Sequence, residues 1–227
     1  MSGPYTLLLR LEGPMQSWGY RSRFDYRDTA LEPTRSGVIG LISAAMGIAR
    51  GEDISPFDAV RMGVRVDSEG RPERDYHTAG GDRYEPREYG VVKADGSGAD
   101  TVVSYRDYLA DAIFTVGLES DDMNLLSAIE GALRNPRWSL FLGRKSFCLS
   151  EHPLSASQPP IVQAPLKDAL EGAAFSLRCK PWRGALTSRL ILETPDGERT
   201  QNDWPLCFRE RRFKPRLIHT TYAGGMP

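Results

Sequence analysis

The sequence predicts an α+β fold of the ferredoxin-like type, and three observations support this. Between residues 1 and 150, segments with strand or helix periodicity follow one another in the order β-α-β-β-α-β, the order that the RRM fold also uses. A long segment, 79–107, interrupts this order between the second and third strands. Beyond residue 150 the composition shifts toward proline, so residues 151–227 are expected to form a small, β-rich C-terminal extension.

The first half of the predicted core is a strand, a helix and a strand. In residues 6–12, Leu7, Leu9 and Leu11 alternate with polar side chains and Leu8 breaks the pattern, which indicates a mostly buried strand. Residues 36–49 carry apolar side chains at helical spacing, with Thr34 or Ser36 as the N-cap. Residues 61–67 alternate again and predict a half-exposed strand.

The second half repeats this pattern. Residues 112–118 form an apolar run that predicts the third strand. Asp121 or Asp122 is expected to cap a helix that stops before Asn135, because a proline follows. In residues 138–142, Trp138, Leu140 and Leu142 stand at alternate positions and predict the fourth strand.

The interruption at 79–107 is rich in glycine, tyrosine and charge. A turn is expected at Asp95–Gly98, flanked by Val91–Val92 and Thr101–Val103, so the segment predicts a protruding β-hairpin. Its charge is acidic on balance, which argues against a simple electrostatic grip on a polyanion.

The C-terminal part begins with a proline-rich linker or irregular arm at 151–165. A short helix is expected at 166–171, followed by a few strands. The tripeptide Pro195-Asp196-Gly197 predicts a hairpin turn.

Composition excludes several classes. The 227 residues contain no apolar run of the roughly 20 residues that a membrane span needs. The first residues lack the basic region and cleavage site of a signal peptide, and the 3 cysteines are odd in number and widely spaced. We therefore expect a cytoplasmic protein without disulfides, bound zinc or a membrane anchor.

Charge is unevenly distributed although the net charge is only −1. Residues 134–146 and 205–219 are strongly basic, whereas the predicted second helix is acidic. Separate basic and acidic faces suit a protein that touches a polyanion on one side and protein on others. An ordinary solvated surface is the alternative.

Three short motifs combine residue types that bind nucleic acid. Gln16-Ser17-Trp18-Gly19 offers an indole that stacks a base, or one that is buried and covers the helix. Thr34-Arg35-Ser36-Gly37 opens the first helix and either cradles a phosphate or serves only as a cap. Gly143-Arg144-Lys145-Ser146 lacks the spacing of a nucleotide-hydrolysing P-loop, but such a basic turn suits an RNA backbone unless it is simply exposed.

Two further positions flank the insertion. Tyr76 and His77, with Lys145, could supply a general base and acid for RNA cleavage if they converge, although a hydrogen-bonding histidine is the simpler interpretation. Arg106 is expected where the hairpin meets the sheet, as a phosphate or base contact or as an ion-pair partner of Asp107, Asp111 or Asp75. His152 and His219 lack the spacing of metal ligands.

Taken in order, the motifs resemble one family. They are LRLEGPMQSWG, PTRSGVIGLISAAMG, DYHT, YRDYLADAIFTV and PRWSLFLGRKS, followed by Cys148 and His152-Pro153-Leu154. This collinear set resembles the CasD family, the RAMP-type subunits of type I-E CRISPR Cascade complexes. Each motif alone is weak, but the ordered set is specific and spans most of residues 1–155, whereas the C-terminal part resembles the family only loosely.

The resemblance implies a RAMP core whose inserted hairpin is a thumb that packs against a CasC backbone subunit. It implies a non-catalytic protein, without cofactor or metal, that caps the 5′ handle of the CRISPR guide RNA and links CasC to the CasA large subunit. Target DNA would be met only through the complex. The RNA-binding residues carried over by the resemblance are Gln16, Ser17, Trp18, Thr34, Arg35, Ser36, His77, Arg106, Gly143, Arg144, Lys145 and Ser146.

Two other functions stay open. A related subunit of type I-C systems is thought to process the precursor transcript, so the chain could be a metal-independent endoribonuclease that processes precursor CRISPR RNA. The third hypothesis is a protein-interaction module with a ferredoxin-like fold and no RNA ligand.

Overall fold

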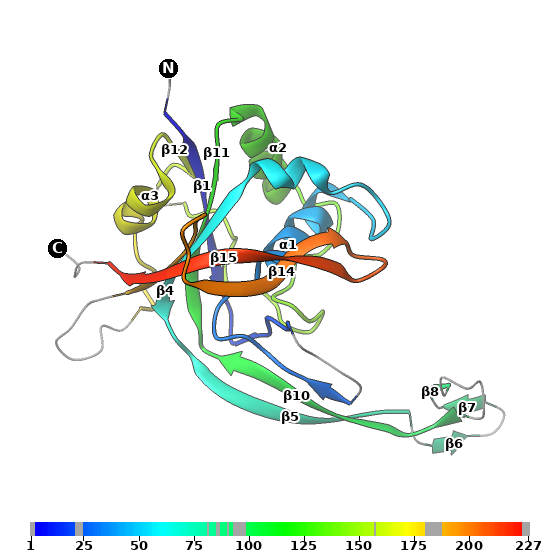
Figure 1. Ribbon diagram of the computed structural model, residues 1–227. Coiled ribbons are helices and arrows are strands. Elements are labelled where there is room, and N and C mark those ends of the chain that lie inside the picture. Colours follow the sequence, from blue (N-terminus) through cyan, green and yellow to red (C-terminus); the bar gives the residue numbers. More distant parts are fainter. Residues whose placement is uncertain are drawn as a thin grey trace.

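The computed structural model describes residues 3–20, 25–80, 82–84, 87–89, 91–92, 99–156, 158–179 and 188–223. Within them the chain forms one large sheet, three α-helices and a long two-stranded ribbon that curves away from the sheet (Figure 1). A short 3-10 helix, η1 (Ser55–Ala59), follows the first α-helix, with Pro56 in its first turn. Each described helix is too short or too polar to span a bilayer.

The large sheet has seven strands, and every neighbouring pair is antiparallel. In spatial order these are β12 (Ile161–Val162), β1 (Tyr5–Glu12), β11 (Ile113–Ser120), β4 (Arg61–Ser68), β13 (Arg189–Glu193), β15 (Arg212–Tyr222) and β14 (Arg199–Cys207). The first four take the order fourth-first-third-second of a ferredoxin-like sheet. The predicted α+β fold class is therefore confirmed.

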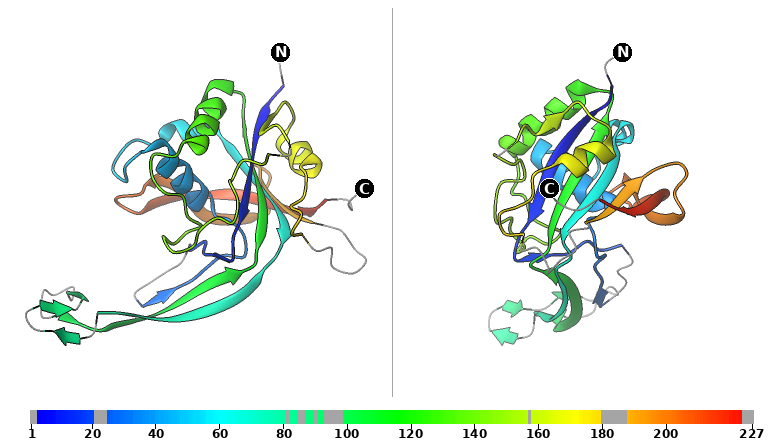
Figure 2. Two further views of the ribbon diagram at one scale, coloured as in Figure 1. Left: turned by 180° about the vertical axis from the view of Figure 1, so that it is seen from behind. Right: turned by 90° about the vertical axis from the view of Figure 1, so that its left-hand side faces the viewer.

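The helices cover both faces of this sheet (Figure 2). α1 (Arg35–Met46) and α2 (Met123–Arg134) pack on one face, and α3 (Leu166–Gly172) packs on the other. Because side chains alternate along a strand, Leu7 and Leu9 of β1 join the core under α1 and α2, whereas Leu8 joins the cluster under α3. Burial on both faces explains why Leu8 departs from the alternation of the strand.

α3 lies close to the sheet at a pair of glycines. Gly63 of β4 and Gly117 of β11 are direct cross-strand partners. A Cβ on Gly63 would lie 2.8 Å from Leu170, and one on Gly117 would lie 2.8 Å from Leu166. The two leucines of α3 therefore occupy the space that larger side chains would fill.

The predicted strand at 138–142 is wrong. The backbone there bonds elsewhere: the N–H of Arg137 donates to Ala45 and that of Trp138 to Ala44, which caps the end of α1 at 2.9 and 3.2 Å. The place beside β1 is taken by the short β12 and by the proline-rich arm. There Leu8 N–H donates to Pro160 and Arg10 N–H to Pro153.

The inserted hairpin is confirmed, but it is longer than 79–107. β5 (Arg71–Ala79) and β10 (Val102–Ala110) pair along their whole length, from Arg71↔Ala110 to Val102↔Ala79. At the tip, β6 (Asp82–Tyr84) pairs with β7 (Arg87–Tyr89), and β8 (Val91–Val92) pairs with β9 (Ala99–Asp100) rather than with 101–103. The predicted turn at Asp95–Gly98 lies outside the described residues.

The C-terminal strands continue the core sheet, because β13 pairs with β4. The predicted turn at Pro195-Asp196-Gly197 forms, because the Gly197 N–H donates to the carbonyl of Thr194 at 3.2 Å. It does not close a hairpin, since β13 and β14, which this loop joins, lie on opposite sides of β15 and pair with it instead of with each other. A domain boundary at residue 150 stays a prediction.

Candidate nucleic-acid interface

The base of the ribbon is wider than its tip. Here β10 pairs with β5 on one side and with β2 (Met15–Gln16) and β3 (Tyr26–Arg27) on the other. Residues directly opposite each other share a face, and the next residue along each strand points to the other face. Two rows therefore lie on opposite faces of the ribbon, Tyr26–Tyr105–Tyr76 on one and Arg27–Arg106–Asp75 on the other.

The face that carries Arg106 holds several of the predicted RNA-binding residues. The Nε of Arg106 donates to Ser104 Oγ at 2.9 Å, and His77 Nδ1 lies 3.4 Å from Asp75 Oδ2. The side chains of His77 and Asp75 are 42% and 47% exposed. The simpler interpretation of His77 is the one that the structure supports, since its ring faces a carboxylate.

Arg106 does not form the ion pairs with Asp107 or Asp111 that the sequence suggested. Asp107 pairs with Arg74 on the opposite face, and Asp111 pairs with Arg71. Asp75, the third candidate, stands directly opposite Arg106 and lies against His77. The hydrogen bond of the Arg106 guanidinium goes to a neutral hydroxyl, which leaves its charge available to a ligand.

The loop 143–146 packs against the same end of the ribbon. Arg144 donates from Nη2 to the carbonyl oxygen of Asp107 at 2.8 Å, and its guanidinium lies 5.2 Å from the Phe147 ring. Burial lowers the pKa of Arg144, and the positive charge of Arg106 lowers that pKa further. The loop therefore brings the guanidinium of Arg144 close enough to Arg106 for their charges to interact. Lys145 and Ser146 of the loop are exposed.

Gly143 fixes the position of this loop. Its φ is 89°, in the left-handed region that favours glycine, and a Cβ there would collide with the carbonyl oxygen of Ser17. The N–H of Ser17 in turn donates to the carbonyl of Leu142 at 3.0 Å. Gly143 shapes the basic loop without offering a side chain of its own.

Gln16, Ser17 and Trp18 lie inside the protein, so the buried-tryptophan interpretation is the correct one. Gln16 is fully buried and donates from Nε2 to the carbonyls of Ala112 and Leu11, at 2.8 and 3.2 Å. Trp18 is 1% exposed, donates from its indole N–H to Gln16 Oε1 and lies against Gly37. Stacking of a base on this indole is not compatible with its burial.

The motif 34–37 is also structural. Thr34 is the N-cap of α1 and accepts from the N–H of Gly37 at 3.3 Å, and Ser36 donates to Thr34 Oγ1. The N–H of Arg35 donates to Asp203 Oδ2 at 2.7 Å. The positive end of the helix is therefore occupied by a carboxylate of β14 rather than left open for phosphate.

The Arg35 side chain completes a buried ionic cluster. It pairs with Glu193 at 3.0 Å, donates to the carbonyl of Phe57 and stacks 3.7 Å from the Trp204 ring. Arg216 bonds both oxygens of Asp203, at 2.6 and 3.0 Å. Burial lowers the pKa of Arg35 and raises that of Glu193, while their mutual attraction opposes both shifts.

The structure thus divides the twelve predicted residues. Three side chains, those of His77, Arg106 and Arg144, gather at the basic face, with Lys145, Ser146 and the backbone of Gly143 beside them. The other six, Gln16, Ser17, Trp18, Thr34, Arg35 and Ser36, make internal contacts. Arg27 was not predicted from the sequence, because its place beside Arg106 follows only from the strand register.

Of the three proposed cleavage groups, Tyr76 does not lie with the other two. Tyr76 and His77 are consecutive residues of β5, so their side chains point to opposite faces of the ribbon. Among the described residues, no group of three metal-ligating side chains is found.

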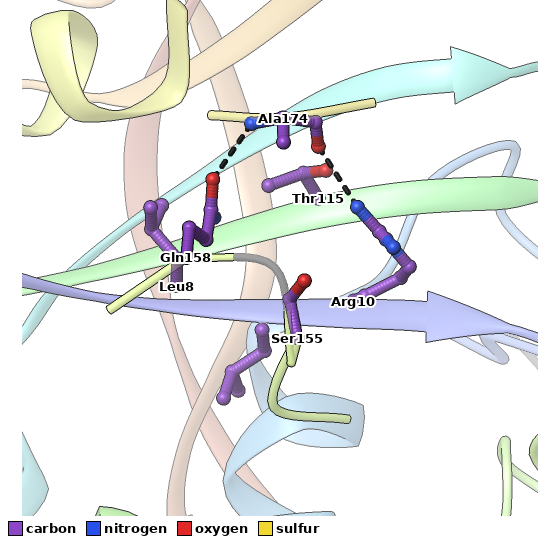
Figure 3. A pocket seen from close by; sticks show the side chains of 7 residues that line it. Leu8, Arg10, Thr115, Ser155, Gln158 and Ala174 are labelled. Carbon is purple, nitrogen blue, oxygen red and sulfur yellow. Dashed lines mark hydrogen bonds between the residues drawn. The ribbon is translucent and has the colours of Figure 1, made fainter. Parts of the chain in front are cut away.

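A small cavity lies elsewhere, between β1, β11 and the proline-rich arm (Figure 3). Arg10 donates to the carbonyl of Ala174 at 2.8 Å, and Gln158 Oε1 accepts from the N–H of the same residue at 2.7 Å. The cavity has the size of a water molecule and is far too small for a nucleotide.

Comparison with known proteins decides the family. The sequence profile described as "CRISPR-associated protein (Cas_Cas5)" matches residues 6–220, nearly the whole chain. The chain belongs to this CRISPR-associated family. The "CRISPR system Cascade subunit CasD" of Escherichia coli (strain K12) is 38% identical, over 97% of this chain and 96% of that protein. The resemblance to CasD, drawn from the motifs, is confirmed.

Solved structures of similar proteins agree with this assignment. A chain of a "CRISPR RNA-guided surveillance complex" matches with a TM-score of 0.80 and 36% identity, over 96% of this chain and 90% of that one. A second, "Crystal structure of Cas protein", matches with a TM-score of 0.74 and 40% identity, over 98% and 99% of the two chains. At these identities the likeness covers the family as well as the fold.

Proposed function

We propose that this chain is the CasD subunit of a type I-E CRISPR surveillance complex and that it binds the 5′ handle of the guide RNA without cleaving it. The gathering of Arg27, Arg106 and Arg144 at the base of the ribbon carries the proposal. Guanidinium groups suit phosphate because they are planar, permanently charged and rich in donors. Phosphate contacts set the register of a single strand, while target sequence is read by guide pairing elsewhere in the complex.

A binding role fits the groups at this face better than a catalytic one. Cleavage by 2′-hydroxyl attack needs a general base and a general acid that reach the same phosphate. His77 faces Asp75 on this side of the ribbon, and the Tyr76 hydroxyl is carried on the other. The precursor-processing endoribonuclease is the alternative that the experiment below tests.

The subunit further links the CasC backbone to the CasA large subunit. The β5–β10 ribbon, which corresponds to the expected thumb, is long enough to contact a CasC subunit. On the C-terminal hairpin, Leu206, Phe213 and Leu217 are exposed apolar side chains, as expected of a surface covered by a neighbouring protein. The site needs no cofactor, and target DNA is met only through the complex.

The test measures binding of mature guide RNA, with and without its handle, to the wild type and to an Arg106→Ala/Arg144→Ala double variant. We expect handle-dependent binding, weaker in the variant, with the salt slope reduced by about 0.7 for each phosphate that the variant no longer neutralises. Arg134→Ala on α2 is the matched control, because its exposed guanidinium pairs with Glu130 of the same helix.

Precursor CRISPR RNA is incubated with the same proteins and examined on a denaturing gel. Intact RNA together with handle-dependent binding supports the capping subunit. A product cut within the repeat, absent in His77→Ala, would show that the chain is the processing enzyme instead. If the isolated chain does not bind, the same variants are compared after assembly with CasC, and equal binding by all of them contradicts the proposal.

A further inference from the structure

The face of the ribbon opposite Arg106 carries a row of three exposed tyrosines. Tyr26, Tyr105 and Tyr76 are direct partners across β3, β10 and β5. Their exposed fractions are 40%, 43% and 61%. We call this row the tyrosine ladder. Large aromatic rings are rarely left so exposed on three adjacent strands unless a ligand or partner covers them.

The rings of the ladder are held in place by one another and by two charged side chains. The Tyr76 and Tyr105 rings meet edge to face, with centroids 5.6 Å apart. The Tyr26 hydroxyl donates to Asp107, and the Arg74 guanidinium lies 5.2 Å from the Tyr26 ring. Arg74 also pairs with Asp107 at 2.7 Å. The ladder is thus preorganised, with its outer ring surfaces open to solvent.

The surroundings of the ladder favour nucleobases over a protein partner. On this face its neighbours along the strands are Arg74, Asp107, Thr78 and the half-buried Val103, so three of the four are polar. The buried centre of a protein interface is usually more apolar than this. Aromatic side chains on adjacent strands are, by contrast, the usual surface on which single-stranded RNA is read.

The dimensions and the position of the ladder also fit RNA. Two strand spacings make the row about 10 Å long, enough for two splayed bases. Tyr105 is followed directly by Arg106, so the basic face and the ladder are the two sides of one thin ribbon. A single strand that passes over the ribbon edge meets arginines with its phosphates and tyrosines with its bases.

We propose that the tyrosine ladder is a second RNA subsite, which stacks one or two bases of the guide strand through Tyr76 and Tyr105. This proposal rests on the function proposed above and extends it from phosphate binding to base stacking. Stacking needs an aromatic ring but no hydroxyl, and it adds no phosphate contact. These properties separate it experimentally from the basic face.

The test compares affinities for mature guide RNA among Tyr76→Leu, Tyr105→Leu, Tyr76→Phe and the control Tyr222→Leu, whose ring is 64% exposed at the end of β15. Each ribbon leucine variant should bind about 5- to 150-fold more weakly, as the loss of one stacked base predicts. The slope of affinity against salt should stay that of the wild type. Tyr76→Phe and Tyr222→Leu should bind as the wild type does.

Photocrosslinking identifies what covers the ladder. Guide RNA with 5-iodouridine at one position at a time is irradiated with the wild-type protein, alone and in the assembled complex, and the linked peptides are identified by mass spectrometry. A link to Tyr76 or Tyr105 supports the proposal. If both leucine variants bind RNA with unchanged affinity while the Arg106→Ala/Arg144→Ala variant binds more weakly, the ladder proposal is overturned and the proposed function stands. Leucine variants that bind RNA normally but fail to assemble would show a protein-binding surface and also overturn it.

Discussion

Two groups of arginines have opposite environments in the fold, although both lie in basic or polar segments of the sequence. Arg35 and Arg216 lie in the interior, 1% and 6% exposed, and each is paired with a carboxylate. Arg106 and Arg144 lie at the ribbon base, where one bonds a serine hydroxyl and the other a backbone carbonyl. Charge that is already neutralised in the interior holds the fold together, whereas charge bonded to neutral groups stays available to a polyanion.

The difference follows from where each arginine stands relative to the C-terminal strands. Asp203 of β14 reaches the N-terminus of α1 and bonds both the Arg35 N–H and Arg216. No carboxylate from the C-terminal strands reaches Arg106 in the described part of the chain, because the ribbon projects away from the sheet (Figure 1). The same residue type thus stabilises the core in one region and offers a binding surface in the other.

The largest effect is expected in the buried group. Asp203→Ala removes the acceptor of the Arg35 N–H and leaves Arg216 with only its 3.4 Å contact to Glu193, so the free energy of unfolding should fall by about 3–5 kcal/mol. Urea denaturation followed by circular dichroism measures this. Asp196→Ala, in the exposed loop before β14, is the matched control and should change stability by less than about 0.5 kcal/mol. Equal stabilities of the two variants would show that the cluster contributes nothing to the fold.

A smaller effect, on both stability and RNA affinity, is expected at the 143–146 loop, which connects the core to the base of the ribbon. Gly143→Ala forces a side chain into a left-handed conformation and against Ser17, so stability should fall by about 2 kcal/mol or more. Guide-RNA affinity should fall as well, because Arg144 is the next residue. Gly131→Ala in α2, where a Cβ meets no neighbour, should instead stabilise by about 0.5–1 kcal/mol and leave affinity unchanged. A fall in stability at unchanged affinity would separate the loop from the RNA site.

Most of the fold follows from local patterns in the sequence. β1, α1 and α2 were predicted because each shows clear periodicity, and β11 because it is a continuous apolar run. β4 was predicted as a strand, but its expected half-exposed character is wrong: Arg65 is buried under α3, where it pairs with Asp67 and donates to the carbonyl of Leu170. The fourth core strand was misplaced because alternation at 138–142 does not say which backbone the segment pairs with, and Trp138 at its start is 45% exposed. β12 has only two residues among prolines, and no periodicity can be read from so short a segment.

The site was predicted only in part, for a related reason. Motif chemistry identified Arg106, Arg144 and His77, but it could not tell exposed polar residues from Gln16 or Arg35, whose partners are distant in the chain. Asp203, which occupies the start of α1, lies 168 residues from Arg35. The tyrosine ladder depends on a register between three strands, which no single segment of sequence contains.

The smallest effect expected is a shift in one titration on the ribbon. The hydrogen bond from Arg74 lowers the pKa of Asp107 below its ordinary value, and Tyr26 lowers that pKa further. Because the pKa is lower in the folded state, ionised Asp107 stabilises the fold above its unfolded pKa of about 3.9, and this is lost as the pH falls through the lower folded value. In Arg74→Gln, NMR of the carboxyl carbon should show the pKa of Asp107 moving upward. Arg71→Gln, whose guanidinium pairs with Asp111 instead, should leave it in place. An Asp107 pKa that is the same in wild type and Arg74→Gln would mean that the Arg74–Asp107 ion pair does not form in solution, and the tyrosine ladder would then lack the support that this pair gives to Tyr26.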